Sequence, residues 1–408
     1  MAMKLSRGHA WSLDALNFLL ADVRGALGPF LNVFLVTQRH WSQSSVGLMT
    51  TIGGLAGILV QTPIGGAIDA TRAKRGAVIL ALMVLAAGAV TLFAWPRFWP
   101  VTVANAAMSI AGDVFGPSVA ALTLGLTART ALARRLGRNS AFDHAGNVAI
   151  ALAVGAVGYV VSQRAVFLLV PVFAVLSVIV VLSIPHAAID QDRARGLDAA
   201  ATGTEDRTTA SGYGAMLRNR PLLVFCICAA LFHFANAPLL PLVGQKLAVA
   251  HPRLADAMMA SCIIAAQLVM LPVALFVGRS ADILGRKPIF LVAFAILPIR
   301  AVLYTLSDNS AWLIGVQLLD GIGAGIFGAL APLVIADIMR GSGRFNLAQG
   351  LAATFQGLGA SLSGLAAGVL VDHAGYGVTF LFLGAAASVA LLVFAVAMPE
   401  TADRSRQQ

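Results

Sequence analysis

The stretch GRSADILGRKP, residues 278–288, separates two long apolar runs of the chain. Its counterpart in the first half of the sequence is GGAIDATRAKR, residues 65–75. In both copies a glycine lies four residues before an aspartate, Asp69 or Asp282, and basic residues follow the aspartate. Internal similarity of this kind is typical of chains built from two related halves of membrane helices. We therefore predict two halves with the same order of elements.

The composition is that of a membrane protein. Hydrophobic residues make up 59% of the 408 residues and charged residues only 11%, whereas a soluble domain carries about 25% charged residues. One helical crossing needs about 20 apolar residues, and apolar runs of about that length or more recur along the whole chain. The predicted fold is an all-α polytopic membrane protein with twelve transmembrane helices in two pseudo-symmetric six-helix bundles. The runs cover residues 11–37, 44–68, 76–95, 99–126, 139–161, 166–184, 222–247, 254–281, 288–306, 312–339, 347–371 and 378–398.

The longest polar stretch, residues 185–220, has the composition of a flexible linker. We predict an N-terminal bundle over residues 1–184, this linker, a C-terminal bundle over residues 221–398 and a tail over residues 399–408. Lysine and arginine accumulate in the linker, in both termini and in every second connection. By the positive-inside rule these segments are cytoplasmic. The expected location is the plasma membrane, which in a bacterium is the inner membrane, with both termini in the cytoplasm.

Charge and cysteine content exclude several classes of protein. The formal net charge is +10, but the basic residues do not gather on one soluble face as in a nucleic-acid binder. The three cysteines, Cys226, Cys228 and Cys262, fall inside apolar runs, where they form neither a disulfide framework nor a spaced set of metal ligands. The sequence also lacks H-E-x-x-H and G-x-S-x-G motifs. We expect no cofactor, no metal, no nucleic acid and no enzymatic activity.

The two motif copies resemble the signature loop of the major facilitator superfamily, G-x-x-x-D-R/K-x-G-R-K/R. The second copy matches well, whereas the first has Ala70 and Arg72 where a basic residue and a glycine are usual. The resemblance extends over essentially the whole chain. It implies two bundles that rock about a central site lined by the first, fourth, seventh and tenth helices. It also implies a gating role at the cytoplasmic face for Asp69 and Asp282.

The gating hypothesis has a simple physical basis. A carboxylate near a helix end can pair with Arg138 or Arg344 in one conformation and release it in another. The alternative is that these loops only set topology and cap helices. Asp143, one turn inside the fifth helix, lies near several arginines and fits the same gate. The predicted gating residues are Asp69, Arg72, Arg75, Arg138, Asp143, Asp282, Arg286, Lys287 and Arg344.

Ionisable and polar side chains also lie well inside the predicted helices. An ionised side chain at the bilayer centre costs roughly 2.5 to 3.5 kcal/mol on insertion scales, so these residues are expected to face protein or a wet cavity. Four of the helices concerned are those that the family resemblance places around the cavity. The predicted substrate and proton pathway consists of Asp22, Arg24, Asn32, Asp113, His233, Asn236, Arg300 and Asp320.

Several roles within this pathway stay open. Asp22 and Arg24 are two residues apart and point to different sides of the helix, so each needs another partner, and the pair could serve only as structural glue. Asp22 or Asp113 could carry a coupling proton. His233 could relay a proton or be a buried hydrogen-bonding residue. Arg300 and Asp320 lie at similar depth on neighbouring runs and could form a structural ion pair.

These observations favour a secondary active transporter of a small organic solute that works by alternating access. Coupling to protons is the expected energy source, and export is one of the directions left open. The expected partners are the solute, protons and the lipid bilayer, and the protein is expected to be a monomer. A passive uniporter is the near alternative, since nothing in the sequence establishes coupling. A receptor or structural membrane protein is the alternative from another class.

Overall fold

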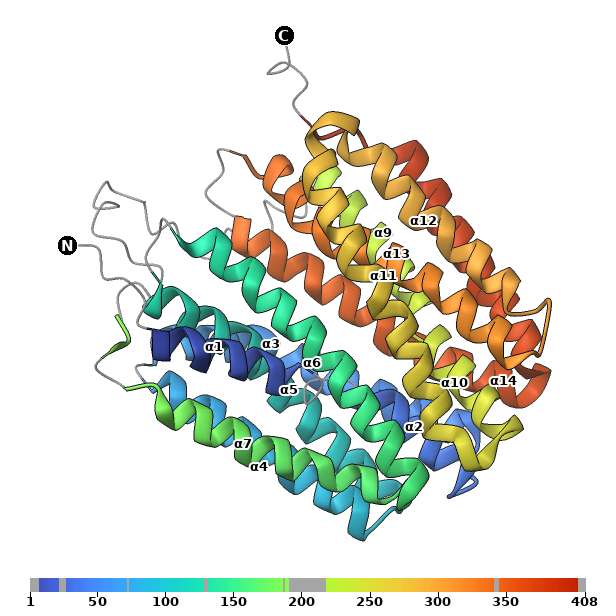
Figure 1. Ribbon diagram of the computed structural model, residues 1–408. Coiled ribbons are helices and arrows are strands. Elements are labelled where there is room, and N and C mark those ends of the chain that lie inside the picture. The colour runs from blue at the N-terminus through green and yellow to red at the C-terminus, as the bar shows by residue number, and fades with distance from the viewer. Residues whose placement is uncertain are drawn as a thin grey trace. The chain divides into compact units, whose positions relative to one another are not determined.

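The computed structural model describes residues 7–21, 27–71, 73–127, 131–185, 188–190, 218–340 and 345–402. All of its regular elements in these ranges are helices, as Figure 1 shows. The all-α fold predicted from the sequence is therefore confirmed. The elements are α1 (Arg7–Leu20), α2 (Leu27–Thr37), α3 (Gln43–Ala70), α4 (Lys74–Ala94), α5 (Phe98–Leu126), α6 (Leu132–Val160), η2 (Ala165–Leu168), α7 (Leu169–Ser183), α9 (Arg220–Asn236), α10 (Leu239–Ala250), η5 (Pro252–Leu254), α11 (Ala255–Leu284), α12 (Arg286–Leu303), α13 (Ser310–Ile338) and α14 (Phe345–Ala397).

The helices expose large apolar side chains, as expected for a protein in lipid. Leu59, Val160, Ile283 and Val396 are each between 73% and 85% exposed, which water would not favour but hydrocarbon does. Within the described ranges, nine helical segments are long and apolar enough to cross a membrane. The chain is therefore a multi-pass membrane protein.

The count of twelve spans stays a prediction. The helix α14 has 53 residues and would be about 80 Å long, far more than the roughly 30 Å of hydrocarbon. It is broken at Gly375, whose φ of 79° suits glycine, so it contains the run predicted over residues 347–371 and all but the last residue of the run predicted over 378–398. The run over residues 11–37 contains α1 and α2, and residues 22–26 between them lie outside the described ranges. The helix α12 carries three basic residues and is not among the nine.

The described residues fall into two compact units. The first unit comprises the described residues within Met1–Arg39, Ile52–Arg207 and Arg253–Ala260. The second unit comprises the described residues within His40–Thr51, Thr208–Pro252 and Ser261–Gln408. The start of α3 thus packs within the second unit and the start of α11 within the first.

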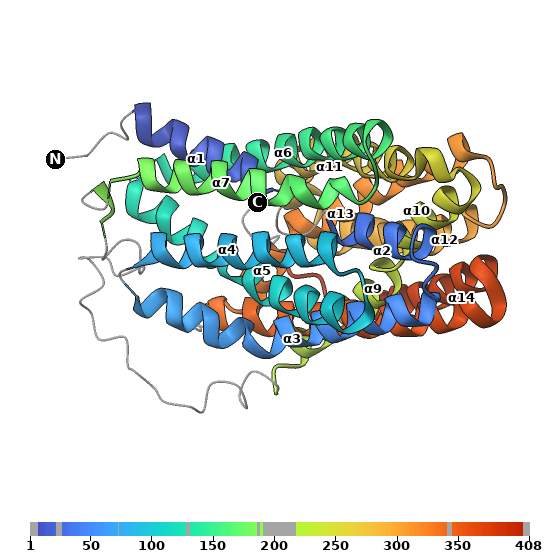
Figure 2. The ribbon, with the colours of Figure 1, turned by 90° about the horizontal axis from the view of Figure 1, so that it is seen from below.

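In the first unit, α1 packs on α6 and α7, and α4 packs on α5 and α7 (Figure 2). Small residues permit these close approaches. A Cβ on Gly146 of α6 would lie 2.2 Å from the carbonyl oxygen of Phe18 on α1. Because lipid tails are as apolar as leucine, such backbone packing holds membrane helices together where the hydrophobic effect does not.

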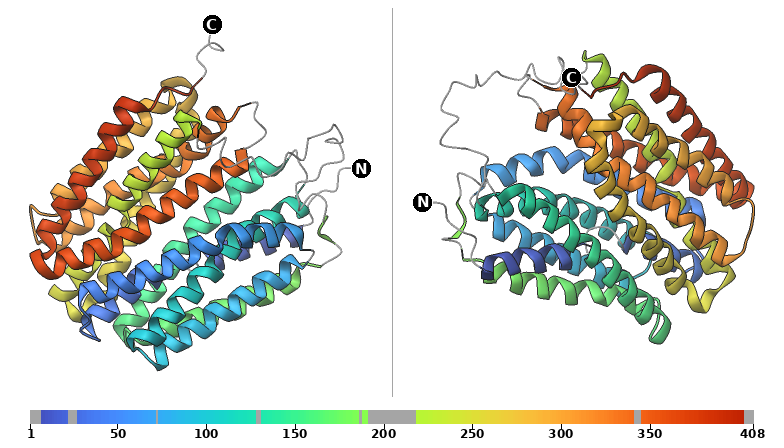
Figure 3. Two further views of the ribbon diagram at one scale, coloured as in Figure 1. Left: turned by 180° about the vertical axis from the view of Figure 1, so that it is seen from behind. Right: turned by 45° about the horizontal axis from the view of Figure 1, so that its top comes forward.

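In the second unit, α14 runs along α9 and α12, which are visible together from two sides in Figures 1 and 3. Phenylalanine rings fill the space between these helices and α13. Phe294 stacks on Phe394 at 4.6 Å between ring centroids, and Phe232 stacks on Phe327 at 4.9 Å. Aromatic rings at such distances prefer offset or edge-to-face arrangements, so this cluster fixes the helices that carry the polar residues described next.

Candidate functional site

A buried ion pair lies between α12 and α13 in the second unit. The Arg300 side chain is 2% exposed, and its Nη1 atom pairs with the Asp320 carboxylate. Its Nη2 atom donates to Oδ1 of Asn236 on α9 at 2.9 Å, and its Nε atom has no acceptor among the described residues. The structure thus brings together three of the predicted pathway residues, and the ion pair expected from the depths of Arg300 and Asp320 is present.

A second polar pair lies beside this one and was not predicted. The Tyr304 hydroxyl donates to Oε1 of Gln317 at 2.6 Å, and both residues are fully buried. Tyr304 is four residues after Arg300, and Gln317 is three residues before Asp320. Because side chains three or four apart share a helix face, this spacing is the signal that could have revealed them.

His233 lies on α9 beside aromatic rings. Its Nδ1 atom donates to the carbonyl oxygen of Ala229 at 2.9 Å, and its ring meets the Phe327 ring edge-on at 4.8 Å between centroids. In the neutral ring with Nδ1 as the donor, Nε2 carries the lone pair. The histidine is therefore tied at one nitrogen and offers an acceptor at the other.

A cavity of about 460 Å³ opens between α13 and α14, beside the same Phe327 ring. Most of its lining is small or apolar, and its polar lining comes from Gln349 and Gln356 of α14. No described hydrogen bond occupies either amide. The cavity therefore offers two unused amide groups and one aromatic ring to a solute.

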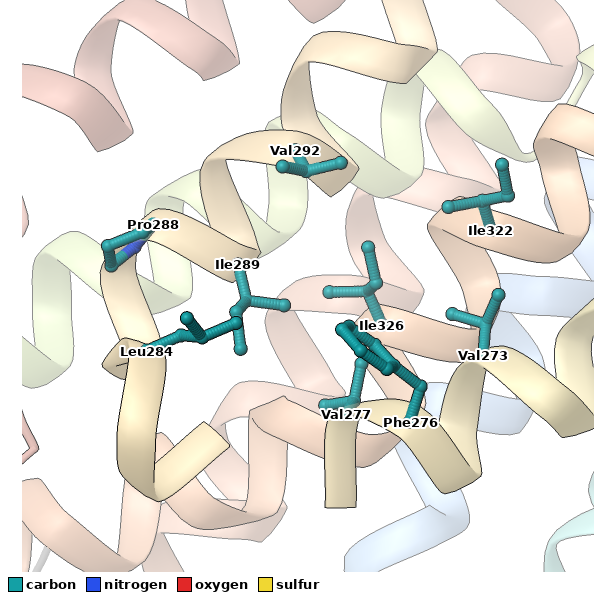
Figure 4. A pocket seen from close by; sticks show the side chains of 9 residues that line it. All are labelled: Val273, Phe276, Val277, Leu284, Pro288, Ile289, Val292, Ile322 and Ile326. Carbon is teal, nitrogen blue, oxygen red and sulfur yellow. The ribbon is translucent and has the colours of Figure 1, made fainter. Parts of the chain in front are cut away.

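A different cavity of about 360 Å³, between α11, α12 and α13, is entirely apolar (Figure 4). Phe276, Ile289 and Ile322 are among its nine lining residues, and none of the nine carries a polar side chain. A pocket without a hydrogen-bonding side chain cannot orient a polar solute. Its nine lining side chains therefore offer no hydrogen bond to a polar solute.

In the first unit, Asp113 lies half-buried on α5 against the glycine face of α3. A Cβ on Gly57 would lie 3.1 Å from Oδ2 of Asp113 and 2.7 Å from Oγ of Ser109. No ion pair or hydrogen bond of Asp113 is found among the described residues. Asn32 of α2 is 7% exposed and its Oδ1 atom has no described partner. Asp22 and Arg24 lie outside the described residues.

Two arginines of α6 converge on one carboxylate of α1. Asp14, with 1% of its side chain exposed, accepts from Arg135 at 2.5 Å and from Arg138 at 2.6 Å. Arg135 also donates to Asn139, which donates in turn to Thr123 of α5. The network joins three helices, and the sequence did not single out Asp14 as a gating residue.

The other predicted gating residues of this unit have local partners or lie outside the description. Arg75 donates to the carbonyl oxygen of Leu182 at 3.3 Å, and Asp143 accepts from Asn147 at 3.5 Å. The Asp69 side chain and all of Arg72 lie outside the described residues, as does Arg344 of the second half.

The corresponding network of the second unit centres on Arg286. Its guanidinium pairs with Asp282 at 2.7 Å and with Asp337 of α13 at 3.1 Å, so Asp282 is bound here by the arginine four residues on. The backbone N–H groups of Arg286 and Lys287 donate to the Glu400 carboxylate at 2.9 and 3.2 Å. Asp337 and Glu400 were not predicted.

Glu400 thus satisfies the free N–H groups at the start of α12. Burial opposes its ionisation, but donation from the N–H groups of Ala402, Arg286, Lys287 and Thr401 outweighs burial, so the pKa of Glu400 lies below its ordinary value. The carboxylate is therefore charged at neutral pH and stabilises the positive end of the helix dipole.

A third carboxylate, Asp372, caps the start of α3 within the second unit. Oδ1 accepts from the N–H of Gln43 at 2.9 Å, and Oδ2 accepts from the N–H and hydroxyl of Ser44 at 2.7 and 2.5 Å. The contact continues about two turns further along α3, where the Thr51 hydroxyl donates to the carbonyl oxygen of Ser361 at 2.6 Å. Asp372 lies between the predicted runs 347–371 and 378–398, in the connection that contains Gly375.

The comparisons with known proteins agree on one family. The family described as Major Facilitator Superfamily matches residues 13–267 and 227–408. An uncharacterized MFS-type transporter of Mycobacterium tuberculosis, found in two strains, is 49% identical over 394 residues, which are 97% of this chain and 94% of the relative. Sugar efflux transporter B of Salmonella typhimurium is 28% identical over 342 residues, 79% of each chain.

Solved structures give the same fold. A mutant form of the nucleoside transporter NupG superposes with a TM-score of 0.77 over 96% of this chain and all of its own, at 14% identity. Another NupG structure superposes with a TM-score of 0.70 over 95% of this chain and 98% of its own, also at 14% identity. At this identity the likeness concerns the fold alone.

Proposed function

The chain belongs to the major facilitator superfamily, and on this premise we propose that it is a proton-coupled secondary transporter of a small uncharged polar solute, working by alternating access. Its multi-pass helical fold and its relatives are those of a transporter of some solute. The substrate class and the coupling are argued below from the residues of each unit.

The observation that carries the substrate class is the cavity beside Phe327. Among the described residues it presents the amides of Gln349 and Gln356 and no charged side chain. An amide both donates and accepts hydrogen bonds, which suits hydroxyl groups, and an aromatic ring suits the apolar face of a sugar-like ring. Arg300, in the same unit, is already neutralised by Asp320. A solute with net charge would find no counter-charge among the described residues there, whereas a neutral polyol needs none.

The relatives favour the same class. By its name, the Salmonella relative exports sugar. We carry to this chain only the chemical class, an uncharged solute with several hydroxyl groups, and the direction, export. The proposed pathway contains Asp22, Arg24, Asn32 and Asp113 of the first unit and His233, Asn236, Arg300 and Asp320 of the second.

Proton coupling rests on Asp113. It is a carboxyl inside a membrane helix that has no partner among the described residues, and Gly57 opposite leaves it in contact with backbone rather than with a cation. A carboxyl whose proton affinity changes between conformations couples proton binding to solute binding reciprocally. Asp22 remains a second candidate for the same role.

The proposed gates are the Asp14 network and the Arg286 network, at the cytoplasmic ends of their helices. We propose that the protein is a monomer in the inner membrane, with both termini in the cytoplasm.

Reconstituted vesicles test the proposal. Counterflow exchange of radiolabelled sugars and nucleosides should exceed that of amino acids and organic cations. A pH gradient should drive accumulation that a protonophore abolishes. In Asp113→Asn, exchange should persist while accumulation is lost; Asp308→Asn, which removes an exposed carboxylate outside the pathway, should behave like the parent.

Each alternative has its own result. Exchange that no pH gradient can drive uphill would favour the passive uniporter. Exchange restricted to charged solutes would contradict the substrate class. Binding without any exchange would favour the receptor.

A further inference from the structure

A carboxyl group with one oxygen that has no partner among the described residues is buried at the start of α11. Asp256 is the second residue of this helix and is 3% exposed. Its Oδ2 atom has no hydrogen-bond partner among the described residues. Acidic residues are common in the first turn of a helix, so its position in the sequence does not distinguish it.

The carboxyl lies directly on the backbone of α6. A Cβ on Gly158 would be 2.0 Å from Oδ2 and 2.6 Å from Cγ of Asp256, so no side chain fits at that position. One turn earlier, a Cβ on Gly155 would be 3.1 Å from Cβ of Ala260 and 3.5 Å from Cα of Ala257. Two glycines of α6 therefore let the first two turns of α11 approach closely, and both segments belong to the first unit.

The charged and titratable groups next to this contact along the chain are engaged elsewhere or exposed. On α6 the neighbour of Gly158 is Tyr159, which is 64% exposed. Beyond α6, Arg164 donates to the carbonyl oxygen of Phe93 at 2.5 Å. Ahead of α11, His251 bonds Ser310 at 3.1 Å and Arg253 is exposed. No described ion pair includes Asp256.

The free energy of the contact therefore depends on one proton. Burying an ionised carboxylate without a partner costs several kcal/mol, much more than burying a neutral carboxyl. When α11 separates from α6, water reaches the group and the ionised form becomes acceptable. Proton binding and closure of the contact are then linked, and each favours the other.

We propose that Asp256 is a second proton-binding site of the transport cycle, which must be protonated for α11 to close on α6 and releases its proton to water when they separate. The inference rests on the proposed function only in linking this proton to transport. In the predicted topology the start of α11 faces the outside, so the proton comes from and returns to that side.

Cysteine labelling of the purified full-length protein tests the contact without any solute. In a variant lacking Cys226, Cys228 and Cys262, Ala260→Cys places a thiol at a position that is 4% exposed. At each pH, the rate of its reaction with a maleimide is divided by the rate measured at an exposed reference position, Gln38→Cys. This division removes the pH dependence of the thiol's own reactivity. One linked proton gives up to about a tenfold change for each pH unit.

The proposal expects the normalised rate to rise with pH in the parent and to stay low at every pH in Asp256→Asn, which keeps the shape of the neutral acid. Gly158→Ala should react fast at every pH because its methyl group prevents closure, whereas Gly137→Ala on the same helix, where a Cβ meets nothing within 4 Å, should match the parent. A rise with pH in Asp256→Asn equal to that of the parent would overturn the proposal, as would slow labelling of Gly158→Ala. If the parent protein in vesicles shows no accumulation driven by a pH gradient, the proposed function is overturned, but the labelling result still stands.

Discussion

The buried Arg300 offers a test that separates structural from functional roles. Asp320→Ala removes the only described carboxylate that pairs with it, and the guanidinium is 2% exposed with its Nε atom already without an acceptor. Asn236 alone cannot neutralise the charge. Removing one partner of a buried ion pair costs about 3 to 5 kcal/mol, which changes the unfolding equilibrium by roughly two to almost four orders of magnitude.

The matched control removes both charges. In Arg300→Met with Asp320→Leu, no unpaired charge remains, and exchange of a buried pair for apolar groups of similar size is often neutral or stabilising. We expect the double variant to recover most of the free energy of unfolding that Asp320→Ala loses. Reversible unfolding in detergent micelles, followed by circular dichroism against denaturant, measures all three proteins.

Counterflow exchange then assigns the role of the pair. If the pair is only structural, exchange recovers with stability in the double variant. If Arg300 and Asp320 also contact the solute, stability recovers and exchange does not. The reasoning fails if Asp320→Ala is as stable as the parent, because the guanidinium would then have another neutralising partner or access to water.

Three further changes test the helix caps and the break in α14. Asp372→Asn removes a charged cap from α3 and should lower the free energy of unfolding by about 1 kcal/mol, with Ser44→Ala as the control that removes only the hydroxyl contact. Glu400→Gln should cost a similar amount at neutral pH. Because the pKa of Glu400 is lowered on folding, its stabilising contribution is present above the unfolded value of about 4.3 and is lost as the pH falls through the folded value. The stabilities of parent and variant should therefore converge in acid, and a difference that stays constant with pH would contradict the cap. Gly375→Ala should lower stability by about 1 to 3 kcal/mol, because φ of 79° and ψ of 173° are strained for a side chain, whereas Gly377→Ala, where a Cβ meets nothing within 4 Å, should be near neutral in the same unfolding measurement.

Features that depend on neighbouring residues along the chain were accessible from the sequence. The apolar runs predicted the all-α membrane fold, and the polar interruption between residues 371 and 378 marked the break that the structure places at Gly375. Counting the rise per residue along two adjacent runs predicted that Arg300 and Asp320 meet. The same spacing argument would have found Tyr304 and Gln317, one turn from each member of that pair.

Features that depend on distant segments were not accessible. Asp14 meets Arg138 across 124 residues, and Asp372 meets Gln43 across 329 residues. Asp282 was expected to exchange with Arg138 or Arg344, but in this arrangement it binds Arg286. Helical periodicity gives the face on which a residue lies and not the helix that covers it, so the partner of each carboxylate had to come from the structure.

Asp256 and Asp372 illustrate why the partner decides the chemistry of a carboxylate. Asp372 accepts hydrogen bonds from two N–H groups and a hydroxyl, so its contact with α3 requires acceptor oxygens and is weakened by a proton. Asp256 lies against Gly158 of α6 and its Oδ2 atom has no partner among the described residues, so on our proposal its contact requires the proton. Acid therefore acts on the two contacts in opposite directions. If both contacts lie on the outer side, as the predicted topology has it, a falling external pH closes α11 on α6 while it loosens α14 from α3, and closure of both at once is confined to a window of pH.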